Sequence, residues 1–292
     1  MNNPVVSVIM ITYGHEKYIE QAIDGVLMQQ TMFPVELIIA NDRSPDRTDV
    51  IVQKYITENI KRDLIRYFNH EKNLGPMPNF IFAVRKSKGK YIAMCEGDDY
   101  WTDPLKLQKQ VDFLEKNTRY SMVCHDALVI DEINNSSKLY FDSLKRKQVC
   151  TTKDTLNIQF CPTGSILGRR NGFLQLIESN ILVNAQAADQ LLVQVISLNG
   201  LLYRMYDVMS VYRKTANGAS ESLKKDLVGN LKNRIDSLDY LNEISNHKYQ
   251  RYIKTEKLLI RNRISILKSK SKFKTGVLRI NKKALSILKK SI

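Results

Sequence analysis

Long apolar runs are missing from this 292-residue chain, although 43% of its residues are hydrophobic. A helix that spans a membrane needs roughly 20 consecutive apolar residues, and no stretch of the sequence approaches that length. The first residues, MNNPVVSVIMITYGHEK, place no basic segment before their short, β-branched apolar run, so we expect no secretory signal. These absences argue against a membrane-spanning protein and favour a globular protein of the cytoplasm.

Cysteine is scarce and has no regular spacing. The four cysteines, Cys95, Cys124, Cys150 and Cys161, form no CxxC pair. Zinc sites and redox motifs place two cysteines close together, and disulfide frameworks need more cysteines in a shorter chain. We therefore expect four reduced thiols.

Acidic residues are absent from the last 36 residues, 257–292, which contain twelve Lys or Arg. Because the whole chain has a formal charge of +15, only about +3 remains for the other 256 residues. The basicity therefore belongs to a tail, for which anionic lipid and nucleic acid are both conceivable partners. The rest of the chain lacks the interleaved basic and aromatic residues of nucleic-acid-binding modules, so we expect no nucleic acid.

Short β-rich segments alternate with helical patterns in the first half of the chain. Four segments carry the apolar, β-branched residues of buried strands: 4–12, 35–42, 64–68 and 89–95. This alternation predicts a parallel-type sheet with crossover helices. After about residue 220 the pattern becomes helical and then strongly basic. We therefore predict an α/β domain over 1–219 and a basic helical extension over 220–292.

Polar side chains follow each of the four predicted strands. Ligands of such sheets bind beyond the carboxyl ends of the strands, where these loops converge. The polar loops are Thr12 to Gly14, Asn41 to Arg43, Asn69 to Asn79 and Glu96 to Asp103. Their convergence indicates a binding site at one edge of the sheet.

Three carboxylates crowd together after the fourth strand, in the stretch MCEGDDYWTDP. Like charges this close repel one another, so Glu96, Asp98 and Asp99 require compensation. A divalent metal, a neighbouring Lys or Arg, or solvent can supply it. In the solvent case the stretch is only an acidic turn ahead of the helix that begins at Pro104.

Five segments, in order and at appropriate spacing, resemble the bacterial family 2 glycosyltransferases. They are VSVIMITYGHEKYIEQAIDGVLMQQ, ELIIANDRSPDRT, NLGPMPNF, GKYIAMCEGDDYWTDPLKLQKQVDFLE and DVMSVYRK. The resemblance runs from about Val5 to about Ser220 and does not cover the basic tail. It implies the GT-A fold, a nucleotide-sugar-binding sheet sandwiched by helices. It also implies inverting transfer of a sugar from a nucleotide-diphosphate donor.

The resemblance implies that the acidic stretch is the family's DxD-type loop, with Glu96 replacing the first Asp. Asp98 and Asp99 are then assigned to the metal and the ribose. Asp98 and, in a supporting role, Glu96 also belong to the nucleotide-sugar site. A diphosphate cannot bind carboxylates directly. A hard divalent cation, Mn²⁺ or Mg²⁺, takes oxygen ligands from both and resolves the repulsion.

The same resemblance implies further contacts with the donor nucleotide. The residues concerned are Thr12, Tyr13, Asp42, Asn73, Gly75 and Asn79. Asp42 resembles a carboxylate that accepts a nucleobase N–H, which favours uracil or thymine, and the Asn73–Asn79 loop matches one beside the ribose. A helix cap is the alternative for Asp42, and a plain turn is the alternative for the loop.

The segment AQAADQLLVQVISLNG resembles the one in which the family's catalytic Asp opens a helix. The resemblance implies that Asp189 deprotonates the acceptor hydroxyl, a task that suits a carboxylate because it only accepts the proton as the hydroxyl attacks. Helix capping is the alternative. Trp101 follows the acidic stretch, where it can stack on an acceptor sugar or pack in the core.

The function implied is an inverting glycosyltransferase that moves a hexose or N-acetylhexosamine, from a UDP-sugar, to a hydroxyl of a surface glycan such as capsule or lipopolysaccharide. A nucleotidyltransferase is the alternative enzyme, but the TYGHEK loop has one glycine where such enzymes carry a glycine-rich phosphate loop. A catalytically silent nucleotide-sugar-binding protein is the non-enzyme alternative.

The tail mixes apolar residues with its basic ones, which is typical of helices that lie in a membrane interface. We expect residues 257–292 to bind an anionic membrane surface, at the cytoplasmic face of the bacterial inner membrane. A lipid-linked glycan acceptor is confined to that surface. Two alternatives are helices that pack on the catalytic domain and a contact between two copies.

Overall fold

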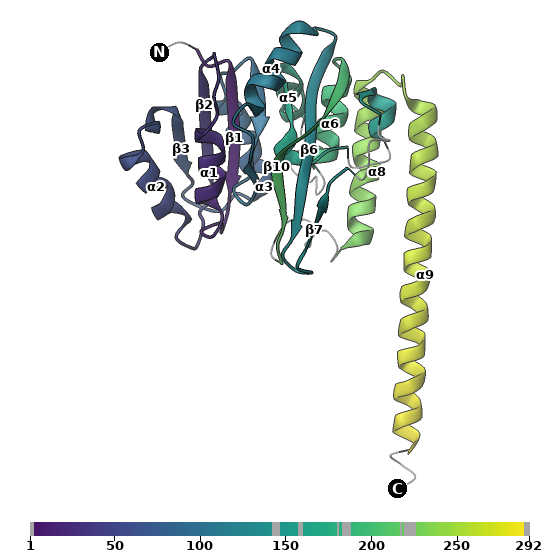
Figure 1. The fold of residues 1–292 in the computed structure, drawn as a ribbon. Helices are drawn as coiled ribbons and strands as arrows, with labels where there is room; N and C mark the ends of the chain where they lie inside the picture. Colours follow the sequence, from purple (N-terminus) through teal and green to yellow (C-terminus); the bar gives the residue numbers. More distant parts are fainter. Residues whose placement is uncertain are drawn as a thin grey trace. The chain divides into compact units, whose positions relative to one another are not determined.

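The computed structural model in Figure 1 describes residues 3–141, 147–156, 160–179, 181–182, 188–216, 218 and 226–288. The chain divides into two compact units, residues 1–225 and 226–292. The boundary expected between residues 219 and 220 lies outside the described residues. The four cysteines are buried free thiols.

One mixed sheet forms the centre of the first unit. In the described part of the chain its order is β3-β2-β1-β4-β9-β6-β10-β5, with β7 paired to β6 and β8 paired to β10. The strands are β1 Val6–Thr12, β2 Val35–Asn41, β3 Ile65–Asn69, β4 Tyr91–Met94, β5 Tyr100–Trp101, β6 Tyr120–Asp131, β7 Ser136–Leu139, β8 Val149–Cys150, β9 Leu167–Arg169 and β10 Leu201–Lys214.

The strands β3, β2, β1 and β4 run parallel, as the sequence predicts. Apolar side chains occupy both faces of β1, so helices must cover both faces of the sheet. The crossover helices are α1 Ile19–Leu27, α2 Thr48–Glu58 and α3 Pro76–Lys86. The other half is not uniformly parallel, because β9 runs antiparallel to both β4 and β6.

Three further helices and three short 3₁₀ turns complete the described part of this unit. The helices are α4 Lys106–Lys116, α5 Arg170–Ile177 and α6 Ala188–Ser197, and the turns are η1 Arg62–Leu64, η2 Thr152–Thr155 and η3 Thr163–Ser165. The prediction of an α/β sheet covered by helices is confirmed.

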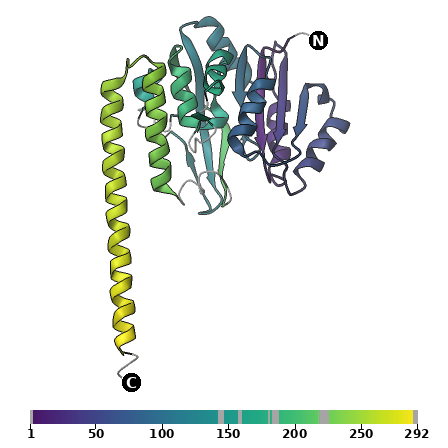
Figure 2. The ribbon, with the colours of Figure 1, turned by 180° about the vertical axis from the view of Figure 1, so that it is seen from behind.

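The second unit is a pair of helices, α8 Leu227–Ile244 and α9 Gln250–Leu288. Two ion pairs join them, from Arg234 to Glu256 at 2.7 Å and from Lys257 to Asp239. Both views show that α9 continues well past the end of α8 (Figure 1 and Figure 2). Among the described residues, no helix is long and apolar enough to cross a membrane.

Candidate active site

The carboxyl ends of the four parallel strands meet at one edge of the sheet. The last residue of β1, Thr12, lies in register with Asn41 of β2, and Asn41 lies in register with Asn69 of β3. The backbone N–H of Asp42 then donates to the Thr12 carbonyl at 2.9 Å, and that of Gly97 donates to the Ile11 carbonyl at 3.1 Å. The structure therefore brings three of the predicted polar loops together around the end of β1.

The acidic loop after β4 holds its carboxylates in unequal environments. The Asp99 side chain is buried, with its Oδ1 accepting the backbone N–H of Arg213 at 2.8 Å. Its Oδ2 is buried without a hydrogen-bond partner in the described part of the chain. The Asp98 side chain is 22% exposed, and its Oδ2 lies 3.9 Å from Nε2 of His15. Asp98 is thus the more accessible carboxylate.

Like-charge repulsion remains strong in this loop. Burial raises the pKa of Asp99 well above its ordinary value, and the charges of Asp98 and Glu96 raise it further, against a smaller opposing effect of Arg213. Burial also raises the pKa of Glu96 to about 8, with Asp98 and Asp189 adding to the effect. The negative charge is therefore only partly compensated by the protein, as expected of a site for a cation.

Asp189 shares this region although it lies 90 residues beyond the acidic loop. It stands in the first turn of α6, partly exposed, and its Oδ1 accepts the backbone N–H of Gln190 at 2.8 Å. The negative charge of Asp189 contributes to the raised pKa of Glu96. The structure thus brings the predicted base close to the predicted metal loop.

Asp42 organises the loop after β3. It is 3% exposed, and its two oxygens accept the backbone N–H groups of Leu74 at 2.7 Å and Gly75 at 2.8 Å. It does not cap α2, since the side chain that bonds to the first turn there is Asp46, through Thr48. A carboxylate oxygen has more than one lone pair, so a nucleobase N–H can still share an oxygen of Asp42.

The residues of the expected ribose loop mainly shape the loop. Asn73 accepts the N–H of Gly75 at 2.9 Å, and Gly75 has a φ of 88°, a value that glycine adopts without strain. Asn79 is 1% exposed and donates to the Ala40 carbonyl at 2.9 Å. Asn79 is thus bound to the end of β2, and its place beside a ribose stays a prediction.

Trp101 is a core residue. It is 2% exposed, its indole N–H donates to the Gly164 carbonyl at 2.8 Å, and the Lys106 ammonium lies 3.8 Å from the ring centroid. This packing leaves no ring face for a sugar, so the structure argues against the expected acceptor contact. The exposed aromatic near the site is Tyr13, which is 49% exposed beside the buried Thr12.

Three comparisons with known proteins bear on this geometry. Residues 7–176 match the model of Glycosyl transferase family 2. The chain belongs to glycosyl transferase family 2.

Relatives of this family 2 glycosyltransferase include the uncharacterized protein Rv1520 of Mycobacterium tuberculosis, which is 34% identical over 220 residues, 75% of this chain and 62% of the relative. The chain thus spans about three fifths of that relative's length. A putative teichuronic acid biosynthesis glycosyltransferase, TuaG of Bacillus subtilis, is 33% identical over 150 residues, 49% of this chain and 58% of TuaG.

Solved structures share the GT-A fold of this glycosyltransferase. TarS of S. aureus, residues 1–349 in complex with UDP, superposes with a TM-score of 0.60 at 18% identity, over 80% of this chain and 65% of TarS. The mannosyltransferase PcManGT of Pyrobaculum calidifontis, in complex with GDP-Man and Mn²⁺, gives a TM-score of 0.63 at 16% identity, over 89% of this chain and 70% of PcManGT.

The acidic loop of this family 2 chain fits a divalent cation bound jointly with a phosphate-bearing ligand. The buried, unpartnered oxygen of Asp99 and the raised pKa values of Asp99 and Glu96 both call for a positive charge. Among the described residues, no group of three or more His, Cys, Asp or Glu side chains is assembled to hold a metal alone. Mg²⁺ is commonly held by one or two carboxylates, with phosphates and water supplying the other oxygens.

Two residues of the site were not predicted from the sequence. Arg213 of β10 donates through its guanidinium to the Asp98 carbonyl at 2.7 Å and to the Gln21 side chain, while its backbone N–H binds Asp99. His15 lies 3.1 Å from the Thr12 hydroxyl and close to Asp98. Both fall within the quoted TYGHEK and DVMSVYRK segments, which are the only sequence signals for them.

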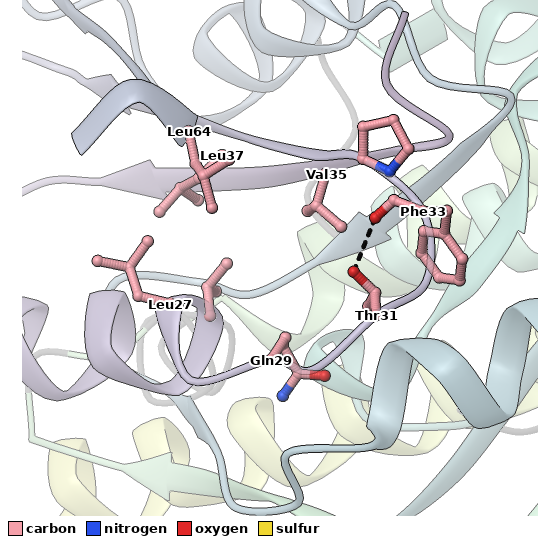
Figure 3. Close-up of a pocket in the computed structure, with 9 residues that line it drawn as sticks. Leu27, Gln29, Thr31, Phe33, Val35, Leu37 and Leu64 are labelled. Carbon is pink, nitrogen blue, oxygen red and sulfur yellow. Dashed lines mark hydrogen bonds between the residues drawn. The ribbon is translucent and has the colours of Figure 1, made fainter. Parts of the chain in front are cut away.

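An apolar pocket of about 140 Å³ lies elsewhere in the first unit, residues 1–225, which we call the catalytic unit (Figure 3). Val35, the first residue of β2, and Leu64, just before β3, contribute to its lining. These are the amino ends of the parallel strands, whereas the acidic loop follows the carboxyl end of β4. The pocket is therefore not the donor site.

Gly97 is the point at which the acidic loop contacts the β1 loop. A Cβ atom on Gly97 would lie 2.7 Å from the Thr12 hydroxyl and 2.8 Å from Nδ1 of His15. We expect Gly97→Ala to lower the free energy of unfolding by about 1–3 kcal/mol, the usual cost of overpacking, and to reduce turnover by displacing the carboxylates. Urea unfolding and a turnover assay measure the two effects.

Gly164→Ala is the matched control for this change. A Cβ atom on Gly164 would meet only Oδ2 of Asp99, at 3.8 Å, an ordinary contact distance. We expect its unfolding midpoint to stay near that of the wild type. Equal stability of both alanine variants would show that Gly97 does not pack tightly against Thr12 and His15.

Proposed function

We propose that this chain is an inverting glycosyltransferase that moves a sugar of the hexose or N-acetylhexosamine class from a UDP-sugar to a hydroxyl of a surface glycan. The observation that carries the proposal is the meeting of carboxylates from distant segments. Glu96, Asp98 and Asp99 follow β4, Asp189 opens α6, and the pKa of Glu96 responds to both sides. Inverting transfer uses such a pair, with a donor-phosphate site on one side and a base on the other.

Asp189 is the proposed base. Its carboxylate accepts the proton of the acceptor hydroxyl while that oxygen attacks the anomeric carbon and the bond to the diphosphate breaks. The attacking oxygen, the anomeric carbon and the leaving oxygen must lie nearly in line. The nearness of Asp189 to the loop after β4, which its effect on the pKa of Glu96 indicates, supports this alignment.

Asp98 and Asp99 are the proposed metal ligands, for Mn²⁺ or Mg²⁺. When bound, such a cation neutralises charge on the departing diphosphate. Arg213 supports this role because its guanidinium donates to the backbone carbonyl of Asp98 at 2.7 Å and its backbone N–H donates to Oδ1 of Asp99 at 2.8 Å, which holds the loop backbone and the Asp99 carboxylate in place. Thr12, Tyr13 and Asp42 are the proposed contacts with the nucleotide.

The donor and acceptor classes are supported by the names of similar proteins. TarS was crystallised with UDP and with UDP-GlcNAc, whereas PcManGT was crystallised with GDP-Man. TuaG is named as a putative teichuronic acid biosynthesis glycosyltransferase, which supports a glycan acceptor. The carboxylate of Asp42 suits a base with a ring N–H, which uracil and guanine both carry, so the donor panel decides between UDP and GDP.

A donor panel tests the proposed reaction. The full chain is incubated with UDP-, TDP- and GDP-sugars, with Mn²⁺ and with EDTA, and the nucleotide products are quantified. We expect release of UDP from UDP-sugars with Mn²⁺ and none with EDTA. Release of pyrophosphate when a nucleoside triphosphate is incubated with a sugar phosphate would indicate a nucleotidyltransferase instead. Donor binding without hydrolysis or transfer, with every acceptor tried, would indicate a silent binding protein.

A further inference from the structure

Helix α9 exposes several large apolar side chains. Tyr252 is 46% exposed, Leu259 is 58% exposed and Ile266 is 55% exposed. These three recur every seven residues, which is close to two helical turns, so they lie along one face of the helix. The neighbouring Leu258, also 58% exposed, widens that strip, which we call the α9 apolar strip.

Basic side chains surround the α9 apolar strip. Arg251, Lys254, Arg261, Arg263 and Lys268 are all exposed. Two acidic residues are used within the helix pair, where Glu256 binds Arg234 and Asp239 binds Lys257, whereas Asp236 and Glu243 are exposed on α8. From Lys257 to the end of the sequence there is no acidic residue. The surface is therefore both apolar and strongly cationic.

The length of α9 enlarges this surface. With 18 residues in α8 and 39 in α9, the helices extend about 27 Å and about 58 Å at 1.5 Å per residue. The pair is antiparallel, as the contact between Asp239 and Lys257 near the connecting turn requires. Roughly half of α9 thus runs beyond its partner helix, as both views show (Figure 1 and Figure 2).

Charge decides which partner fits the α9 apolar strip. A second copy of the chain would bring another helix with twelve cations and no anion in its last 36 residues, and the two would repel. The phosphates of a nucleic acid would pair with the cations, but the exposed Leu and Ile side chains would stay in contact with water. An anionic lipid surface satisfies both, since it offers phosphates to Lys and Arg and an acyl region to the apolar residues.

We propose that α9 lies on an anionic lipid surface, with Tyr252, Leu259 and Ile266 inserted at the boundary between headgroups and acyl chains. Arg251 and Arg263 flank the strip, about 80° and about 40° around the helix from Leu259, and contact the lipid phosphates. Each such cation strengthens binding to an anionic membrane about fivefold. The proposal uses no residue of the proposed donor site, so its test is separate from the test of the proposed transfer reaction.

Vesicle co-sedimentation of the full chain tests the proposal. The vesicles are pure phosphatidylcholine or phosphatidylcholine mixed with phosphatidylglycerol, at low and high salt. We expect sedimentation with the anionic vesicles only, weakened at high salt. The double variant Leu259→Gln/Ile266→Gln and the double variant Arg251→Gln/Arg263→Gln should each lose about tenfold or more in partition.

Matched substitutions on the catalytic unit separate this effect from a general change of surface. Ile60, which is 96% exposed, and Lys54, exposed on α2, become Gln in the controls Ile60→Gln and Lys54→Gln, which should sediment as the wild type does. Circular dichroism checks that each variant keeps its helix content. Equal sedimentation of wild type and both α9 variants, or no sedimentation with anionic vesicles, overturns the proposal. A concentration-dependent dimer that Leu259→Gln/Ile266→Gln dissolves, without lipid binding, assigns the strip to a second copy.

Discussion

Asp98→Asn and Asp99→Asn are each expected to reduce sugar transfer by about 10²-fold or more, the scale seen when one group that stabilises transition-state charge is removed. The amide cannot supply the negative charge that a cation and a diphosphate share in the proposed site. Turnover is measured as release of nucleoside diphosphate across a range of Mn²⁺ concentrations. We expect neither variant to be rescued at concentrations that saturate the wild type.

The two variants should differ in stability. Asp99 is buried, with one oxygen lacking a partner among the described residues, whereas Asp98 is partly exposed. Because the folded-state pKa of Asp99 is raised above its ordinary value of 3.8, its ionisation opposes folding, and stability falls as the pH rises through that raised pKa. In EDTA at neutral pH, Asp99→Asn should therefore unfold at a higher temperature than the wild type, and Asp98→Asn at a similar one.

Asp112→Asn is the control for both substitutions. Asp112 is an exposed carboxylate on α4, bonded only to Gln108 in the hydrogen bonds described, and we expect its variant to match the wild type in turnover and unfolding. Full activity of the wild type in EDTA, together with full activity of both loop variants, would refute the metal site.

Asp189→Asn should reduce kcat by about 10²–10⁴, the usual contribution of a general base, and should leave the affinity for the donor nearly unchanged. The reason is that the amide cannot accept the proton of the attacking hydroxyl, whereas the proposed donor contacts come from the loops after β1, β2 and β4. Steady-state kinetics with varied donor and acceptor give kcat, and titration of UDP gives the affinity.

Glu178→Gln is a suitable control, because Glu178 is an exposed carboxylate at the end of α5 in the same half of the catalytic unit. It should behave as the wild type. A loss of UDP affinity in Asp189→Asn with kcat retained would place Asp189 in donor binding. Unchanged kinetics would mean that another residue is the base.

Much of the site was predictable because parallel strands end at a common edge. The apolar strands over 4–12, 35–42 and 89–95 and the polar residues after them located Thr12, Asp42 and the acidic loop near one another, and the register of β1 and β2 confirms that arrangement for the first two. The helical character of the C-terminal segment followed from its apolar spacing. These inferences use only periodicity and local chemistry.

Contacts between distant segments were not predictable in this way. Arg213 and Asp99 are 114 residues apart in the sequence, and they meet because β10 pairs with β5. No local sequence pattern predicts this pairing. Likewise, β9 runs antiparallel beside β4, although the sequence suggested a parallel-type sheet. Such pairings depend on how the whole sheet assembles.

The sequence by itself determined the family, the succession of strands and helices along the first half of the chain, and the cluster of carboxylates after β4. These features depend on local patterns and on motifs in a fixed order along the chain. Only the tertiary structure decided which side chains face the site. Trp101 and Asn79 are polar or aromatic residues in motif positions, yet both are buried, because each finds its hydrogen-bond partner inside the core. Burial is a property of the assembled layers, and a buried polar group stays where its partner is.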